Sequence, residues 1–556
     1  MRWLIIIASL CFAVRGEAQS PALRKDVLDR LAKSEHRLNF AVTSARINTD
    51  INLDRAYRDL DTLLAREYGD MFWMYGMAGL YHSSKELLDD ATKARFREAW
   101  KHRTPYRGDT ENHFLMYYSS LLLMSEVWPG LPGSEWFTGR SSKEIHAESR
   151  EYLLHWMQRA ARYGLNEWDS PRYQYYFLTP LLLLANHAKD TTVRKTSSML
   201  VEVMLAELAL KYVNGNYVGA HSRTFEAAAQ NARIGETLAY AEFFFRDSVI
   251  ALQPDLAFAA LSDWSCPAII SELAGPRSKG VVLREAKQGR PALRYTQTDT
   301  LVPKVTYIAP RYSLGSIQDG LVQPIQQQTW KLVFHDIPGV NTITGLHPYI
   351  SERELATFFP EEPSFQAERI ESTKVGYSSE NKWVGGSPYQ RIRQEQRIIF
   401  LAYDIPASDR TQHADFFVPA AIEWKTKPEK DSTLKPHKWY AITGGGVECE
   451  LYFTTTMQTS REANGVRLRS RAAKFRAIVR VVEDEPLDSR LNHHRTLARE
   501  LMDDRKWQRA ERAADNSARK YLYSTVQMNS KRGSGVITIN GQGVKRVIDF
   551  NLLDVR

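Results

Sequence analysis

An asparagine and a histidine stand side by side where an apolar run begins, in the stretch ENHFLMYYSSLLLMSEV that starts at Glu111. Asp109 or Thr110 is a plausible helix N-cap, so Asn112 and His113 are expected in the first helical turn. That turn carries unpaired backbone N–H groups and the positive end of the helix dipole, which favour an anion. The amide and the imidazole would add directed donors to a carboxylate. Taken alone, the pair favours the plainer interpretation of a capping asparagine beside a core histidine.

A second cluster lies in the stretch EWDSPRYQYY, which begins at Glu167. Ser170 followed by Pro171 is typical of an N-cap and the first residue of a helix. Tyr173 is then expected in the first turn, with Tyr176 one turn further along the same face. Tyrosines bunched beside a loop favour a solvent-filled site, although a well-capped, tyrosine-rich core helix would show the same pattern.

A third cluster follows a glycine-bounded loop in the stretch NGNYVGAHSRTF. His221 and Arg223 are expected just before or at the next helix start, with Ser222 or Thr224 as caps. The alternative is a loop histidine and a surface arginine without a shared role.

The three clusters gain meaning together, because each is expected at the N-terminal end of a helix. In a toroid of helical hairpins the inner helices run parallel, so their starts face the same opening. An amide, two imidazoles, a guanidinium and several tyrosines would then converge on one cleft.

Such a set of groups suits β-elimination of a uronic-acid polysaccharide. The C5 proton lies next to the sugar carboxylate, and its removal requires that the charge of this carboxylate be neutralised. Each preorganised donor is worth roughly 10²–10³ in rate, and a positioned acid or base roughly 10²–10⁴. Free tyrosine ionises near pH 10, so a tyrosine base needs a cationic neighbour such as Arg223 or a charged histidine. The scheme requires no metal and no cofactor.

Two other functions remain open at this point. Glu167 and Asp169 could serve as the carboxylate pair of a glycoside hydrolase. A glycan-binding protein without catalysis could keep the same fold. No nucleophile elbow, P-loop or dinucleotide fingerprint is visible, and no nucleic-acid recognition motif accompanies the scattered basic residues.

The elements that must position these residues follow from the period of the apolar pattern. From about residue 23 to 273 the period is helical, with room for on the order of a dozen helices. From about 280 to 485 the pattern is strand-like. The sequence therefore predicts a multidomain protein, with an (α/α) toroid over residues 19–275 and an antiparallel β-sandwich over residues 276–556. A charged helical segment is expected near 489–521, and the last strand, SGVITINGQG, is expected to rejoin the sheet.

Residues 1–18 have the pattern of a secretory signal peptide, with a charged start, a short apolar stretch and a small-x-small cleavage site. We therefore expect a secreted or periplasmic protein without a membrane span after cleavage. The chain of 556 residues has a net charge of +9, and removal of two arginines and one glutamate with the signal leaves +8. A basic exported protein fits an anionic partner, which the sign of the charge alone leaves open as an acidic polysaccharide or oligosaccharide, a membrane surface or a nucleic acid. The many aromatic residues suit stacking on sugar rings, although large cores also use them.

Few cysteines are available for disulfides. Cys11 leaves with the signal, so only Cys266 and Cys449 remain, and the sequence does not decide whether they pair. No cysteine-based zinc motif is present.

The two short motifs resemble those of the heparinase II/III-like and oligoalginate polysaccharide lyases. ENH matches the adjacent Asn-His of that family, and EWDSPRY matches its E-x-S-P-x-Y-like segment with one extra residue. The separation of 61 residues between Asn112 and Tyr173 is also similar. The resemblance implies an α/α toroid followed by a β-sandwich, and β-elimination of a uronate-containing polymer.

The resemblance also implies roles for particular residues. Asn112 and His113 would neutralise the substrate carboxylate, and Tyr173 would act as general acid and also as a candidate base, with His221 as the alternative base. Arg223, Tyr176 and Glu167 would bind the substrate. The family uses a further histidine, often from the sandwich, for which His335 and His347 are candidates. In the same domain, Arg311 and Tyr312 of PRYSLGS would reach the cleft.

Overall fold

The structure, a computed structural model, covers most of the chain. It describes residues 19–36, 38–66, 69–103, 105–108, 110–275, 277–288, 301–318, 322, 326–350, 378–425, 438–482, 496, 503–519, 526–529, 534–537 and 547–549. The expected signal at residues 1–18 and the candidate cap Asp109 lie outside these residues.

The first half is helical, as the 3.6-residue period predicts. Several helices begin at a side chain that accepts from free backbone N–H groups, among them Asn39, Asp70, Ser141 and Asp190. The helices are α1 (Pro21–Lys33), α2 (Phe40–Thr49), α3 (Leu53–Ala65), α4 (Met71–Ser84), α5 (Asp90–His102), α6 (Glu111–Val127), the 3-10 turn η1 (Gly133–Glu135), α7 (Ser142–Tyr163), α8 (Tyr173–His187), α9 (Thr191–Lys211), α10 (Glu226–Gln230), α11 (Thr237–Phe245), α12 (Leu256–Ala260) and α13 (Ala268–Leu273).

The helices form a ring with inner and outer members. Helix α2 packs on α4, α4 on α6 and α6 on α8, and the short α12 packs on α8, α4 and α2 and so closes the inner circle. The outer helices pack around this inner circle, with α3 on α2, α5 on α3, α7 on α6 and α9 on α8. The inner helices α4, α6 and α8 are buried around most of their circumference, which their nearly continuous apolar sequences require. The predicted (α/α) toroid is confirmed.

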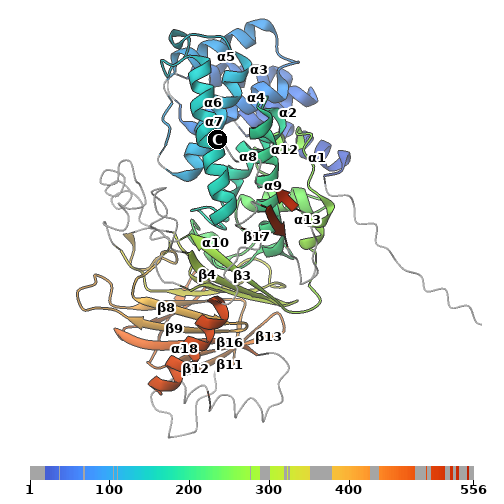
Figure 1. The fold of residues 1–556 in the computed structure, drawn as a ribbon. Helices are drawn as coiled ribbons and strands as arrows, with labels where there is room; N and C mark the ends of the chain where they lie inside the picture. The colour runs from blue at the N-terminus through green and yellow to red at the C-terminus, as the bar shows by residue number, and fades with distance from the viewer. Residues whose placement is uncertain are drawn as a thin grey trace, which may run out of the picture.

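The second half forms two antiparallel sheets that lie below the helical domain in Figure 1. An eight-stranded sheet has the order β14-β15-β10-β7-β6-β5-β4-β3, and a six-stranded sheet has the order β11-β12-β13-β16-β9-β8. The strands are β3 (Val281–Gln288), β4 (Leu301–Ile308), β5 (Tyr312–Ile317), β6 (Trp330–Phe334), β7 (Thr342–Leu346), β8 (Gln390–Glu395), β9 (Ile398–Asp404), β10 (Ala414–Pro419), β11 (Glu423–Lys425), β12 (Lys438–Gly444), β13 (Val447–Phe453), β14 (Gln458–Glu462), β15 (Gly465–Ser470) and β16 (Lys474–Val482).

The core of the sandwich lies between the two sheets. Trp330, Leu332 and Phe334 alternate along β6 and point into this core, where they join residues of both sheets. Lys331 and Val333 point the other way, and Val333 belongs to the apolar core of the helical domain. The eight-stranded sheet is therefore covered on both faces, and the predicted antiparallel β-sandwich is confirmed.

The two domains meet closely at a pair of glycines. Gly219 lies in the loop after β2 (Asn216–Tyr217), which pairs with β1 (Tyr212–Val213), and has a φ of +91°. A Cβ on Gly315 of β5 would lie 2.6 Å from the Gly219 Cα. Only glycine at these positions allows the helical-domain loop to lie directly on the sheet.

The C-terminal segment departs from one expectation. Helix α18 (Asp504–Arg519) covers the outer face of the six-stranded sheet, where the Trp507 and Phe400 rings are 5.6 Å apart. The strand expected to rejoin the sandwich, β18 (Ser534–Ile537), instead pairs with β17 (Val526–Asn529) and β19 (Val547–Asp549) in a separate three-stranded sheet. Local pattern predicts a strand but does not identify its partners.

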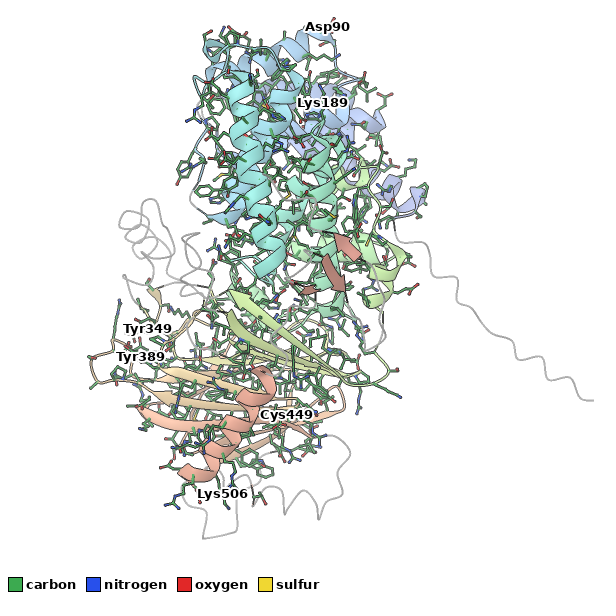
Figure 2. All side chains as sticks on the ribbon, in the orientation of Figure 1. Asp90, Lys189, Tyr349, Tyr389, Cys449 and Lys506 are labelled. Atoms are coloured by element: carbon green, nitrogen blue, oxygen red, sulfur yellow. The ribbon has the colours of Figure 1, made fainter. Side chains whose placement is uncertain are left out.

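The two remaining cysteines lie in different domains and do not form a disulfide with each other. Cys266 precedes α13, whereas Cys449 is buried in β13, where Figure 2 labels it.

Among the described helices, none is both long and apolar enough to cross a membrane.

Candidate active site

The first turn of α6 holds the loop that precedes α8. Glu111 accepts a hydrogen bond of 2.7 Å from the Asn166 backbone N–H through Oε2, and its Oε1 pairs with Arg159 at 3.1 Å. The neighbouring Asn112 donates its side-chain amide to Glu167 Oε2. Burial raises the pKa of Glu111, and Arg159 opposes this rise. Two consecutive residues of the ENH motif therefore fix two consecutive residues of the following loop.

Glu167 connects this loop to the third cluster. Arg223 donates from Nε to Glu167 Oε1 at 2.8 Å and from Nη1 to Gln326 Oε1. Its guanidinium carbon lies 4.3 Å from the centre of the Tyr173 ring. Arg223 has a φ of +48°, a conformation that non-glycine residues adopt only when their surroundings enforce it. The series of hydrogen bonds from Asn112 through Glu167 to Arg223 thus ends at the ring of Tyr173.

Ser170 lies two positions before the N-cap of α8, which is Arg172, so its predicted place as the N-cap itself is wrong. Its Oγ accepts from the backbone N–H groups of Arg172 and Tyr173, at 3.3 and 2.9 Å, and donates to the Arg223 carbonyl at 2.9 Å. Pro171 lies in the turn, and α8 begins at Tyr173. One hydroxyl therefore fixes both the start of α8 and the backbone that carries Arg223.

Half-buried aromatic side chains line the open side of this network. Phe72 contacts the His113 ring at 5.7 Å and the Tyr176 ring at 5.2 Å, and Tyr176 lies 6.1 Å from Tyr173. Phe72 and Tyr176 also border a cavity of about 690 Å³ at this end of the ring. His113, Tyr173 and Tyr176 are each partly exposed, so they can reach a bound molecule.

Asn112 lies deeper than the sequence suggested. Its side chain is fully buried, and its amide is committed to Glu167. A direct contact with a substrate carboxylate is not available to it in this arrangement. Asn112 instead orients Glu167, which in turn orients Arg223.

His221 also lies outside the cleft, which corrects its expected position as a base. It is fully buried, with Nδ1 2.6 Å from the Asp169 carbonyl and Nε2 3.2 Å from the Tyr217 carbonyl. Burial, together with Lys331 and Lys304, holds its pKa well below the usual value. Residues 221–224 are not a helix start, because His221 pairs in an antiparallel bridge with Gln328 of the sandwich. His221 therefore positions the backbone behind the site.

The residues expected from the sandwich also lie elsewhere. Tyr312 is buried in the sandwich core. His347 is buried between Ser387 and the Thr411 carbonyl, at 3.0 and 2.8 Å, next to Tyr349 and Tyr389, which Figure 2 labels at the edge of the sandwich. His335 is buried beside the Pro310 carbonyl. The sandwich instead contributes Gln326, which binds Arg223.

Asp169 is fully buried at the junction of the two domains. Lys211 of α9 lies 2.5 Å from its carboxylate, Lys287 of β3 lies 3.2 Å away, and Lys304 of β4 donates to it as well. These three cations hold the Asp169 pKa well below its usual value against the opposing effect of burial. Asp169 has a φ of +49°, so this ion-pair cluster holds a strained residue of the loop.

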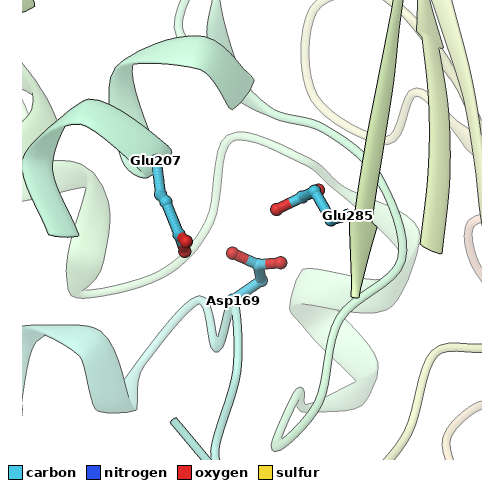
Figure 3. Close-up of side chains that lie close together, drawn as sticks. All are labelled: Asp169, Glu207 and Glu285. Atoms are coloured by element: carbon cyan, nitrogen blue, oxygen red, sulfur yellow. The ribbon is translucent and has the colours of Figure 1, made fainter. Parts of the chain in front are cut away.

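Three carboxylates gather at this cluster, those of Asp169, Glu207 and Glu285 (Figure 3). Their spacing would suit a metal ion, but lysines already neutralise them. Lys211 lies 2.7 Å from Glu285, and Lys287 lies 3.3 Å from Glu207 and 3.0 Å from Glu285. Three ammonium groups balance three carboxylates, which leaves no charge for a cation to compensate.

Comparison with known proteins adds little to this geometry. No family model matches the chain, and no curated protein matches its sequence. A solved structure is similar. It is a crystal structure of heparinase III, with a TM-score of 0.39 and 8% identity over 80% of this chain and 76% of that one. Because both the TM-score and the sequence identity are low, this similarity supports no conclusion about the chemistry of the chain.

Proposed function

We propose that this chain is a polysaccharide lyase that cleaves a uronate-containing glycan by β-elimination. The observation that carries the proposal is the stacking of Arg223 on Tyr173, whose ring lies 6.1 Å from Tyr176 at the border of the cavity. The guanidinium supplies the positive charge that a tyrosinate requires in a water-poor site. Glu167 holds the Arg223 side chain and Ser170 holds the Tyr173 backbone, so the pair is preorganised before substrate binds.

The partly exposed His113 is the donor that can reach a substrate carboxylate, and the buried Arg223 adds positive charge beside Tyr173. The delocalised enolate formed when C5 loses its proton places further charge on that carboxylate. Donors fixed in advance stabilise this charge without reorganisation. Asn112 contributes through Glu167, which holds the arginine in place.

Tyr173 performs both proton transfers in this scheme, since His221 lies behind the loop. As tyrosinate, it takes the C5 proton through its phenol oxygen. The electrons of the C5–H bond form the C4–C5 double bond while the C4–O4 bond breaks. The phenol then returns its proton to the leaving O4, so protons and electrons balance without a cofactor. Tyr176 contributes a ring surface beside the sugar.

The geometry disfavours the hydrolase alternative. Asp169 is fully buried among three lysines, and both oxygens of Glu167 are occupied by Asn112 and Arg223. A glycosidase acid must reach the glycosidic oxygen, and its partner must reach the opposite face of the sugar. Neither carboxylate is placed to do so.

We expect the protein to meet its polymer outside the cytoplasm, because residues 1–18 carry an export pattern.

The test of the proposed reaction is digestion of a panel of uronate polymers in heavy-oxygen water, followed by mass spectrometry. A lyase yields unsaturated ends that contain no oxygen from the solvent. Products that carry solvent oxygen at every new reducing end would contradict the proposal and favour hydrolysis.

A further inference from the structure

A second hollow of about 810 Å³ lies on the sandwich, beside the edge strand β14. Arginines, amides and hydroxyls make up most of its lining, together with two glutamates and Trp383, and many of these residues belong to β14 and β15. Such a set of groups can bind the hydroxyls and carboxylates of a sugar chain at the same time.

Buried side chains beneath this hollow fix two of the arginines that line it. Trp383 packs under the Arg467 guanidinium, which lies 3.9 Å from its ring, and Arg467 donates to Glu462 at 2.6 Å. Asp415 is fully buried and accepts from Arg467 and Arg469. The positions of these two arginines are therefore fixed, and two carboxylates already balance their charges.

Arg471 differs from these two arginines. It continues their alternation at the end of β15, it is exposed, and its Nε donates to Gln458 Oε1 at 3.2 Å. Among the described residues, it has no carboxylate partner within ion-pair distance. One uncompensated guanidinium therefore stands at a rim of amides and hydroxyls, which suits an acidic sugar better than a neutral one.

The hollow and the candidate active site share a wall. The Phe225 ring lies 6.4 Å from Tyr173 and 4.0 Å from the Arg172 guanidinium carbon. The next residue, Glu226, lines the hollow and accepts from the Trp383 backbone N–H at 3.0 Å. Two consecutive residues, Phe225 and Glu226, therefore connect the candidate active site with the hollow.

We propose that this hollow is a second binding site for a carboxylated segment of the same polysaccharide, with Arg471 binding the carboxylate and Gln458 a neighbouring hydroxyl. The identity of the ligand rests on the proposed function. The site would hold long chains across both domains and would add nothing to the binding of short oligosaccharides that fill only the cleft.

The experiment measures binding of a uronate polymer and of its size-defined oligosaccharides to the full chain carrying Tyr173→Phe, which separates binding from turnover. Arg471→Ala is added to this background, with Arg461→Ala as the control. Arg461 is an exposed arginine of β14 outside the hollow, and its removal costs the same charge. We expect Arg471→Ala to weaken polymer binding about tenfold or more and to leave the shortest bound oligosaccharide unaffected.

Equal losses from both arginine variants would reduce the effect to general charge attraction and overturn the second site. No loss from Arg471→Ala, or no binding of any uronate polymer, would overturn it as well. A polymer that binds through Arg471 but is never cleaved by the unmodified protein would sustain the hollow and contradict the lyase. Cleavage of the polymer together with no effect of Arg471→Ala would sustain the lyase and contradict the second site.

Discussion

The guanidinium of Arg223 lies over the ring of Tyr173, with its carbon 4.3 Å from the ring centre. The two residues are 50 positions apart, and the loop at residues 167–170 fixes both of them. Ser170 accepts from the Tyr173 backbone N–H and donates to the Arg223 carbonyl, whereas Glu167 binds the Arg223 side chain. The pair is thus the point at which the three sequence clusters meet.

Tyr173→Phe should reduce kcat by about 10²–10⁴-fold, because it removes the group that carries both proton transfers. The ring and its packing remain, so the melting temperature should change little. Steady-state kinetics on a cleaved polymer, with thermal unfolding in parallel, measures both effects. Tyr57→Phe on the outer helix α3 is a matched control. A Tyr173→Phe variant with near-normal kcat would assign the chemistry to another residue.

Asn112→Ala should lower kcat more than it lowers stability. The change leaves Glu167 without its amide donor and costs about 1–3 kcal/mol of unfolding free energy. The larger effect falls on Arg223, which Glu167 no longer orients. Because Asn112 and Glu167 act as a unit, the double variant with Glu167→Gln should lose little more activity than either single variant. Strictly additive losses would show that Asn112 acts independently of Glu167.

Asp169→Asn should destabilise the protein by about 3–5 kcal/mol, since it leaves three buried lysines against two carboxylates. Adding Lys304→Met restores the charge balance and should recover part of this loss. Thermal or denaturant unfolding of both variants checks the expectation, with the exposed Asp247→Asn as control. A stable Asp169→Asn protein that has simply lost activity would instead indicate a catalytic carboxylate.

Asp255 should make stability fall as pH rises. Burial raises its pKa from 3.8 to about 6, against a smaller opposing effect of the hydrogen bond from Tyr75. A carboxyl group whose pKa is raised by folding stabilises the folded state fully below its unfolded pKa. That contribution disappears as pH passes from about 4 through about 6, and amounts to at most about 3 kcal/mol.

Asp255→Asn should therefore flatten the pH dependence of the melting temperature between pH 4 and about 7. The exposed Asp263→Asn should leave the slope unchanged. If Asp255→Asn and the unmodified protein lose stability in parallel over this range, Asp255 is not the group that titrates.

The sequence was sufficient to predict the order of the domains and the meeting of the three clusters. The change of apolar period near residue 280 separates helices from strands, and capping signals place the helix starts at Glu111 and Tyr173 to within two residues. These features are local, so a single chain reveals them.

Contacts between distant segments were not predictable in this way. His221 pairs with Gln328, and Lys304 reaches Asp169 across 135 positions. Neither contact leaves a local pattern, so His221 was placed in the cleft and the buried lysines were missed. One signal was available: Glu285 and Lys287 follow Val281 and Leu283 on one face of β3. Buried charges of this type require partners.

The most direct test of the lyase is the ultraviolet absorbance of the unsaturated uronate during digestion of an anionic polymer. We predict that absorbance rises in step with new reducing ends for the unmodified chain, and that Tyr173→Phe abolishes both signals. Reducing ends that accumulate without any rise in absorbance would contradict β-elimination and show that the chain hydrolyses its substrate.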